Sequence, residues 1–365
     1  MPDVAARRLG AHRLTGVPFA SAVEAVGALG AVQSQDFAGA RWALAQRLPE
    51  TTDGELGRLY DSGAILRTHV LRPTWHLVLR EDIRWMLALT APRIRRGLVA
   101  RYRELGLDAA IAARAAEAFG AALAGGLALT RAELAEVLRR RGISPDGQRL
   151  AHLLMSAELD GLIVSGPRRG AQVTWALLDD RAPRVIGWEG GDAVAELARR
   201  YFRSHGPAQL IDFVWWSGLT VSQGRQGLTV AADSLAVEVI AGSEHWFDPD
   251  RGPALSARGA AHLLPNFDEY TVAYRDRSAV HDRDRPLDPA LLSYRSVLSN
   301  VLTIAGVARG AWRRTISGDR VDVEIRVSTP LRQAESAAVE REALRLGRFL
   351  ERPVTIDWVV LPPPV

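Results

Sequence analysis

Residues 65–79 read Ile-Leu-Arg-Thr-His-Val-Leu-Arg-Pro-Thr-Trp-His-Leu-Val-Leu, and this stretch decides the fold that we expect. Aliphatic, β-branched and aromatic residues fill both halves, and Arg72-Pro73 separates them. Such a pattern predicts two strands, residues 65–71 and 74–79, joined by a short turn. Helical patterns come before the strands, and helices followed by a β-hairpin are typical of a winged-helix unit.

The chain before the hairpin has helical periodicity. Apolar residues recur at helical spacing over residues 3–15 and 19–30. Thr52 and Glu55 have the spacing of a capping box, which predicts a further helix immediately after Thr52. These helices and the hairpin together make the first predicted unit.

The same order of elements returns twice more along the chain. Thr130 and Glu133 form another capping box, and the helices after it precede a hairpin with a Gly-Pro-Arg-Arg-Gly turn. A third set begins near Gly191 and again runs from helices to two strands. The predicted elements are helices over 130–141, 144–160, 192–204, 207–216 and 220–231, and strands over 162–165, 171–178, 235–240 and 243–247. Three sets in succession predict a repeated architecture, although the sequence similarity between them is faint.

We therefore expect an α+β fold, mainly helical, with three tandem winged-helix (helix-turn-helix) units followed by a C-terminal β-rich α+β unit. The predicted boundaries of the four units are residues 1–105, 106–185, 186–255 and 256–365. The alanine-rich segment 106–128 is predicted to be a helix that connects the first two units. The predicted elements of the last unit are strands over 301–308, 310–316, 321–327 and 354–360 and a helix over 331–350.

Composition places the chain among globular proteins and excludes several kinds of chemistry. Hydrophobic residues make up 47% and charged residues 24% of the 365 residues, which excludes a disordered chain. Because there is no cysteine, disulfides, thiolate catalysis and cysteine-based zinc sites are excluded. No apolar run approaches the ~20 residues that cross a bilayer, and no secretory signal is visible. We therefore expect a cytoplasmic protein that does not contact a membrane.

The basic residues are all arginine, 46 in number, and the net charge is +4. A GC-rich genome explains this usage by itself, whereas phosphate recognition is the functional alternative, because guanidinium groups pair bidentately with phosphate. The arginines gather in three places, namely Arg93, Arg95 and Arg96; Arg168 and Arg169; and Arg275, Arg277, Arg283 and Arg285. The middle group lies at a predicted wing tip, where arginine commonly contacts the DNA backbone or minor groove.

Two glutamines, Gln33 and Gln35, follow the second predicted helix. In extended chain their side chains would share a face, and in a loop after a helix they would be able to converge on one water molecule or one ligand. An amide has no useful pKa, so such a pair suits only a leaving group that is already activated, such as a positively charged alkylated purine. On residues alone, a hydrogen-bonding role at the end of a helix is the default interpretation.

The hairpin carries further polar residues. Strand alternation places Arg67 with His69 on one face and Thr74 with His76 on a common face of the second strand. Two histidines seven residues apart suggest a metal pair, but no carboxylate cluster stands near them in sequence. We therefore predict no metal site, and expect the histidines to hydrogen-bond inside the protein or to line a pocket.

Four longer segments resemble the AlkZ/YcaQ superfamily of bacterial winged-helix DNA glycosylases. They are Val-Gln-Ser-Gln at 32–35, the hairpin at 65–78, Asp-Phe-Val-Trp-Trp-Ser-Gly-Leu at 212–219, and Leu-Leu-Pro-Asn-Phe-Asp-Glu-Tyr-Thr-Val-Ala-Tyr-Arg-Asp-Arg at 263–277. The first is poorly specific, and the other three together are much stronger. The resemblance implies three tandem winged-helix units in a C-shape, and monofunctional hydrolysis of N-glycosidic bonds to alkylated purines in double-stranded DNA, without a cofactor.

The resemblance also implies roles for individual residues. Gln33 and Gln35 fall on a catalytic Gln-apolar-Gln motif, although Ser34 replaces the bulky apolar residue. The branch that unhooks interstrand crosslinks has aspartate at the second position, so Gln35 indicates the AlkZ branch. Asp36 is expected to project elsewhere. The residues expected to line or support the site are His69, Arg72, Thr74, His76, Asp268 and Tyr270. The residues expected to bind DNA are Arg67, Arg95, Arg96, Arg168, Arg169, Arg275 and Arg277.

Two other classes of function stay open at this point. One is a non-catalytic winged-helix DNA-binding protein, such as a regulator. Regulators commonly dimerise on palindromic half-sites, and the sequence has no heptad or other obvious dimer element, which favours a monomer. The other is a scaffold that binds a protein or a toxic small molecule, which would leave the arginine-rich tips unexplained.

Overall fold

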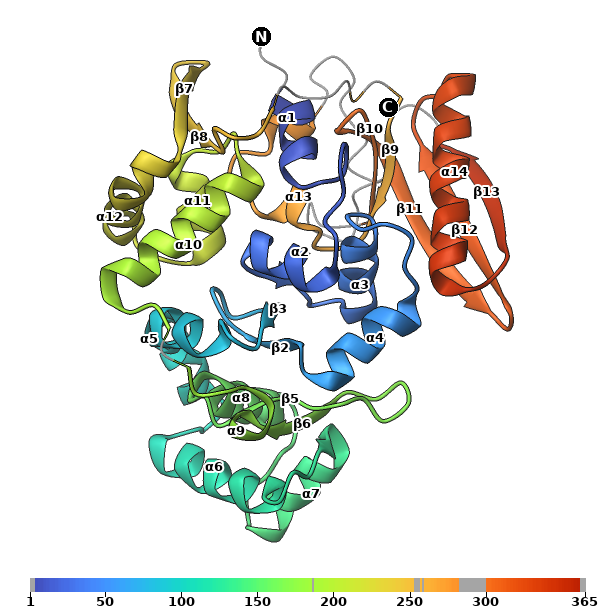
Figure 1. Ribbon diagram of the computed structural model, residues 1–365. Coiled ribbons are helices and arrows are strands. Elements are labelled where there is room, and N and C mark those ends of the chain that lie inside the picture. Colours follow the sequence, from blue (N-terminus) through green and yellow to red (C-terminus); the bar gives the residue numbers. More distant parts are fainter. Residues whose placement is uncertain (1–3, 186, 253–256, 258, 282–299, 362–365) are drawn as a thin grey trace.

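The computed structural model describes residues 4–185, 187–252, 257, 259–281 and 300–361, drawn as ribbon in Figure 1. It confirms the α+β class, because helices dominate and the strands of these residues form sheets of three, five, three and two strands. None of the helices in the described ranges has the length and apolar character needed to cross a membrane.

The first set of elements contains the predicted hairpin. Its elements are α1 (Val4–Ala11), α2 (Ala22–Leu29), β1 (Val32–Gln33), α3 (Phe37–Ala45), α4 (Asp53–Ser62), β2 (Ile65–His69), β3 (Trp75–Leu79) and α5 (Ile83–Glu104). β3 pairs antiparallel with both β2 and β1, so the sheet order is β1-β3-β2. β2 ends two residues earlier than predicted, because Leu71 enters the left-handed region with φ 64° and begins the turn. The predicted capping box of Thr52 and Glu55 is present.

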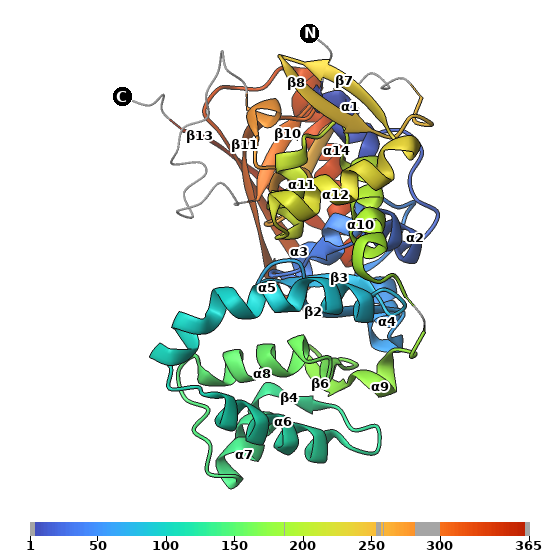
Figure 2. The ribbon, with the colours of Figure 1, turned by 90° about the vertical axis from the view of Figure 1, so that its left-hand side faces the viewer.

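The second set repeats this topology. Its elements are α6 (Ala109–Leu123), β4 (Leu129–Thr130), α7 (Arg131–Arg140), α8 (Arg149–Leu159), β5 (Ile163–Ser165), β6 (Thr174–Leu177) and α9 (Leu178–Arg181). The sheet order β4-β6-β5 again puts the short first strand beside the last. The helix predicted over 106–128 is present as α6, and it also contributes to a core. Phe119 of α6 is fully buried in a core with Leu134 of α7 and Leu154 of α8, so α6 is part of this set, and α5 runs between it and the rest of the molecule (Figure 2).

The third set has the same order with a reduced sheet. Its elements are α10 (Gly190–His205), α11 (Leu210–Ser217), α12 (Val221–Ala231), η1 (Ala232–Ser234), β7 (Ala236–Ile240) and β8 (Ser243–Phe247). Here a single residue, Ala208, bridges to Trp246 of β8 where the other sets have a short first strand. The recurrence of helices and hairpin is therefore confirmed. The number of winged-helix units, their boundaries and the C-shape stay predictions.

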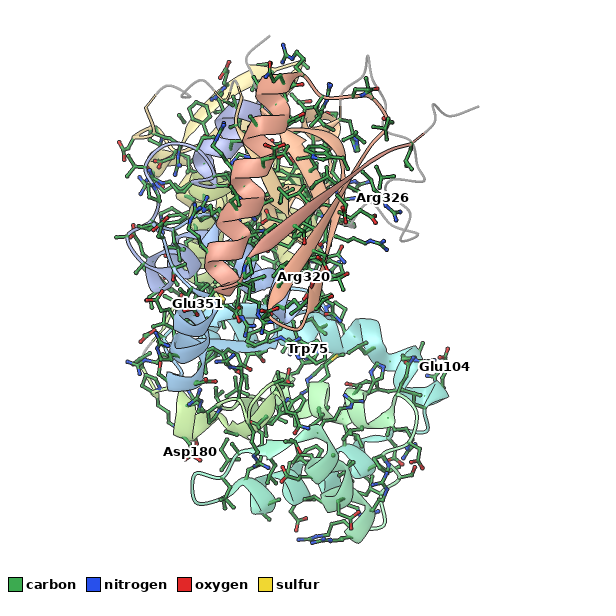
Figure 3. The ribbon with its side chains drawn as sticks, turned by 90° about the vertical axis from the view of Figure 1, so that its right-hand side faces the viewer. Trp75, Glu104, Asp180, Arg320, Arg326 and Glu351 are labelled. Carbon is green, nitrogen blue, oxygen red and sulfur yellow. The ribbon has the colours of Figure 1, made fainter. Side chains whose placement is uncertain are left out.

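The last set forms a five-stranded sheet covered by a helix. Its elements are β9 (Ala261–Leu264), α13 (Glu269–Val272), η2 (Ser278–Val280), β10 (Val301–Ile304), β11 (Val307–Ser317), β12 (Arg320–Val327), α14 (Gln333–Leu350) and β13 (Val354–Val360). The strand order is β13-β12-β11-β10-β9, and α14 lies across the sheet in Figure 3. Leu346 of α14 shares a core with Val323 of the sheet and Trp42 of α3, so this set packs directly on the first.

Helix α11 of the third set ends against the turn of the first hairpin. Gly218 follows α11 with φ 69°, and a Cβ atom at this position would lie 2.3 Å from the carbonyl oxygen of Leu71 and 3.4 Å from Cγ of Arg72. Glycine is needed here both for the left-handed conformation and for the close approach. The contact fixes the position of α11 relative to the turn that carries Arg72.

We expect Gly218→Ala to lower the free energy of unfolding by about 2–4 kcal/mol, because it combines left-handed strain with a backbone clash. Urea unfolding measures this change. Gly97→Ala is the matched control, because Gly97 lies in α5 with no atom within 4 Å of an added Cβ. That change should stabilise the helix by up to about 1 kcal/mol. A Gly218→Ala midpoint at or above wild type would contradict the close contact.

Candidate active site

The first of the two predicted glutamines lies on one face of the β1-β3-β2 sheet. Gln33 of β1 is opposite His76 of β3, and His76 is opposite Thr68 of β2. Residues directly opposite each other in antiparallel strands project to the same face. Gln33, His76 and Thr68 therefore form a row across this face, and Thr74 lies immediately before β3.

Gln33 is held through both its backbone and its side chain. Its backbone N–H donates to Oε1 of Glu269 at 2.6 Å, and its side-chain Oε1 accepts from the Arg72 guanidinium at 2.8 Å. Only 6% of the residue is exposed. Because a guanidinium only donates, the amide oxygen must face Arg72, and the amide NH2 group is left for another partner.

Gln35 differs from Gln33 in exposure. Its side chain is exposed, and its Oε1 accepts from the Trp75 N–H at a long 3.4 Å. Asp36 accepts from the Gly39 N–H at 3.0 Å and caps α3, so it turns away from the glutamines as predicted. The chain thus passes from strand to helix cap within three residues, with one amide fixed and buried and the other open to solvent.

A carboxylate that the sequence analysis did not single out, Glu269, lies behind Gln33. It is 1% exposed, accepts from Trp216 Nε1 at 2.9 Å, and lies 3.6 Å from Nε2 of His205. Burial acts to raise the pKa of Glu269, but the hydrogen bonds from His205 and from the Gln33 N–H act in the opposite direction, and the pKa lies below its ordinary value. Its position between Asp268 and Tyr270, in a segment that resembles the family, was the sequence feature that pointed to Glu269 as a site residue.

His76, the next residue of the row, is a neutral imidazole. Its Nδ1 donates to the carbonyl oxygen of Thr74 at 3.0 Å, which leaves Nε2 as a hydrogen-bond acceptor. Complete burial, together with the charge of Arg72, lowers the pKa of His76 to about 3. Within the described ranges, no group of three or more histidine, cysteine, aspartate or glutamate side chains is arranged to hold a metal ion.

Arg67 and His69 lie on the opposite face of the same sheet. The Arg67 guanidinium donates to the Ser34 carbonyl at 2.9 and 3.0 Å and lies 4.2 Å from the ring centre of Trp75. His69 Nδ1 is 2.5 Å from Oε2 of Glu158 in α8. Trp75 itself lies where the upper part of the molecule meets the lower (Figure 3). The structure thus separates these two residues from the row that contains Gln33.

Asp268 and Tyr270, which flank Glu269, make structural contacts. Asp268 accepts two hydrogen bonds from the buried Arg47 guanidinium, at 2.7 and 2.9 Å. The Tyr270 hydroxyl donates to the Gly306 carbonyl at 2.8 Å. Both side chains are buried, and their contacts anchor the segment that carries Glu269.

Three of the arginines predicted to bind DNA are paired within the chain. Arg168 and Arg169 at the β5–β6 turn bond Asp61 of α4 at 2.9 Å and Glu133 of α7 at 2.7 Å. Arg95 pairs with Asp160 of α8. The wing tip of the second set is therefore tied to the first set through Arg168, and contact of these three arginines with DNA stays a prediction.

The remaining predicted arginines differ in exposure. Arg96 of α5 and Arg275 after α13 are exposed, while Arg277 is half-buried with its Cζ 5.8 Å from the ring centre of Trp215. Their DNA contacts also stay predictions. Arg283 and Arg285 lie outside the described residues.

Comparison with known proteins identifies the family of this chain. A family model described as "DNA glycosylase AlkZ-like" matches residues 26–349, which include both glutamines and Glu269. The chain belongs to the AlkZ-like DNA glycosylase family. Among solved structures, Streptomyces sahachiroi DNA glycosylase AlkZ superposes with a TM-score of 0.76 at 22% identity, over 97% of this chain and 98% of that chain.

This AlkZ likeness confirms the fold, and the family match confirms the resemblance seen in the motifs. None of the curated proteins compared with the chain matches it. Membership of the AlkZ-like family supports a DNA glycosylase, that is, a hydrolase with DNA as its substrate. It does not specify the lesion.

We expect Asp268→Ala to destabilise the protein by about 3–5 kcal/mol, because it leaves the buried charge of Arg47 without a partner. Thermal or urea unfolding measures this loss. Asp319→Ala, at an exposed turn position between β11 and β12, is the control and should change stability by at most about 0.5 kcal/mol. Equal stability of the two variants would contradict the role given to the Arg47–Asp268 pair.

The buried histidine predicts loss of stability in acid. Unfolded His76 protonates near pH 6.5, whereas its folded pKa is about 3, so between these values the unfolded state binds one more proton. Acidification therefore favours unfolding, by up to about 1.4 kcal/mol per pH unit. Replacing His76 by glutamine should remove this contribution and flatten the fall in unfolding free energy between about pH 6 and pH 4.

Urea unfolding at several pH values tests this slope. His281→Gln, at an exposed position, is the matched control and should follow the wild-type curve. A His76→Gln curve parallel to wild type would show that His76 does not contribute to acid sensitivity.

Proposed function

We propose that this protein is a monofunctional DNA glycosylase that hydrolyses the N-glycosidic bond of alkylated purines in duplex DNA, with cationic or bulky N7 or N3 adducts as substrates. The observation that carries the proposal is the place of Gln33. It stands at the catalytic position implied by the family, fixed by Arg72 and Glu269, beside the exposed Gln35.

The chemistry of the residues supports an activated leaving group. Amides cannot protonate a departing base, so they suit a purine whose alkylation has already given it positive charge. As that purine leaves, positive charge moves onto the sugar, and preorganised dipoles stabilise it without reorganisation. The buried carboxylate of Glu269, bonded to the backbone of Gln33, adds a negative charge behind the site.

The two glutamines would divide the work. Arg72 occupies one lone pair of the Gln33 oxygen, so Gln33 offers mainly its NH2 donors to the substrate or to water. Gln35 is accessible and its oxygen is only weakly engaged, at 3.4 Å, so it is free to accept a hydrogen bond from the attacking water. As the bond between C1′ and the purine nitrogen breaks, the purine departs with the electron pair of that bond. The water oxygen bonds to C1′, and the proton that this water loses passes to solvent.

DNA binding would use the arginines that are exposed. Arg96 and Arg275 are available without rearrangement, whereas Arg168 and Arg169 must exchange Asp61 and Glu133 for phosphate. We also propose that the protein acts as a monomer, without a metal or cofactor, on DNA in the cytoplasm.

We expect wild-type protein to release N7-alkylguanine from duplex DNA faster than spontaneous depurination, and Gln33→Ala and Gln35→Ala each to reduce release by about 100-fold, the size expected for loss of one preorganised polar group. Release is measured by single-turnover chromatography of the free base. The double variant should lose less than the product of the two single losses, because residues that act as a unit are not additive.

Gln333→Ala is the control, because Gln333 is an exposed glutamine at the start of α14. It should retain wild-type release. If wild-type protein releases no base from either methyl or bulky adducts, yet binds duplex DNA with the salt dependence of phosphate contacts, the non-catalytic DNA-binding alternative is correct.

A further inference from the structure

One aromatic side chain beside the glutamine site has no role in the reaction described above. Trp215 of α11 is 43% exposed, whereas the adjacent Trp216 is fully buried and donates to Glu269. A single exposed tryptophan is common on protein surfaces. The neighbours of Trp215, and not its exposure alone, distinguish it.

The indole ring of Trp215 is fixed in place. Its Nε1 donates to the Val272 carbonyl at 3.1 Å, so its only polar atom is satisfied. Helix α11 ends two residues later at Ser217, and the next residue, Gly218, abuts Leu71 and the side chain of Arg72. The ring is therefore held beside the hairpin turn without a ligand, and little ordering would be needed when one binds.

Two guanidinium groups lie next to this ring. The Cζ atoms of Arg72 and Arg277 are 5.7 and 5.8 Å from the ring centre of Trp215. Arg72 also donates a hydrogen bond to Gln33, so one guanidinium group lies between the catalytic glutamine and the indole. Burial lowers the pKa of both arginines, and in the part of the chain that the structure describes neither forms an ion pair with a carboxylate. Of the two, only Arg72 is under the influence of a carboxylate of the described residues, that of Glu269, so an anionic ligand would have two guanidinium groups to pair with.

We propose that Trp215, Arg72 and Arg277 form a lesion-recognition subsite, in which the indole stacks on an aromatic ring of the damaged nucleotide and the guanidinium groups bind an adjacent phosphate. The aromatic ring is the alkylated purine itself or an aryl group attached to it. The subsite rests on the proposed function, because Gln33 marks the position of the damaged nucleotide.

The combination of groups favours a nucleotide over a protein partner. A protein interface would use the apolar surface of the indole, but it would not explain two guanidinium groups beside it that form no salt bridge among the described residues. Planar guanidinium groups match the geometry of phosphate, and an indole stacks on any base. An electron-poor alkylated purine is, in addition, a good partner for the electron-rich face of tryptophan.

The test measures binding and does not depend on catalysis. The probes are duplexes with 2′-fluoro nucleotides that resist depurination, carrying guanine, N7-methylguanine or N7-benzylguanine at one position. Fluorescence anisotropy gives Kd for wild type, Trp215→Ala, Trp215→Phe and Trp188→Ala. Trp188 is the matched control, because it is 45% exposed and lies before α10, away from these arginines. Thermal unfolding verifies that each variant is folded.

Trp215→Ala should weaken binding of the damaged duplexes by about tenfold or more, the size of a lost stacking contact, and leave the undamaged duplex within about twofold. Trp215→Phe keeps an aromatic face and should recover most of the affinity, whereas a purely structural role would make both variants defective. If Trp215→Ala loses more affinity for N7-benzylguanine than for N7-methylguanine, the indole stacks on the aryl group of the adduct. If the two losses are equal, the indole stacks on the purine.

Three results would overturn the subsite. They are unchanged affinity of Trp215→Ala for damaged DNA, an equal loss on undamaged DNA, and a change of oligomeric state in Trp215→Ala, which would make the surface a contact between copies of the chain. None of these results depends on base release. Failure of the subsite and failure of the proposed hydrolysis are therefore distinguishable.

Discussion

The carboxylate of Glu269 joins parts of the chain that are far apart in sequence. It accepts from the backbone of Gln33 at the edge of the first sheet and from the indole of Trp216 in α11 of the third set. A buried carboxylate is stable only when such donors replace the water it has lost. The hydrogen bonds that stabilise this buried charge therefore also hold β1 and α11 together. The site forms only when these distant parts of the chain have folded against each other.

The sequence was most informative where short-range rules act. The capping box of Thr52 and Glu55 placed the start of α4 correctly, and alternation in the first strand of the hairpin separated Arg67 and His69 from Thr68. Both depend on residues within a few positions of each other. The family resemblance rested mainly on segments 65–78, 212–219 and 263–277, and the match to residues 26–349 confirms it.

The sequence was least informative where distant segments meet. Glu269 lies 236 residues from Gln33, and the pairing of Arg168 with Asp61 spans 107 residues, so no local spacing rule links them. Local rules also left open whether Gln33 and Gln35 lie in extended chain or in a loop, and the strand ends at Gln33, two residues before Gln35. The burial of Arg67 could not be predicted from the sequence either, because an arginine in an alternating strand is equally compatible with a surface or an interior position.

The contact of Gly218 with Leu71 has a consequence for DNA. A fixed α11 gives the protein little freedom to reshape itself around a lesion, because moving this helix would withdraw Trp215 and disturb the turn that holds Arg72. Under the proposed function, the duplex must then supply most of the distortion. Flexible pyrimidine–purine steps deform at lower cost than stiff A-tracts, so the bases that flank a lesion would influence its repair even where the protein does not touch them.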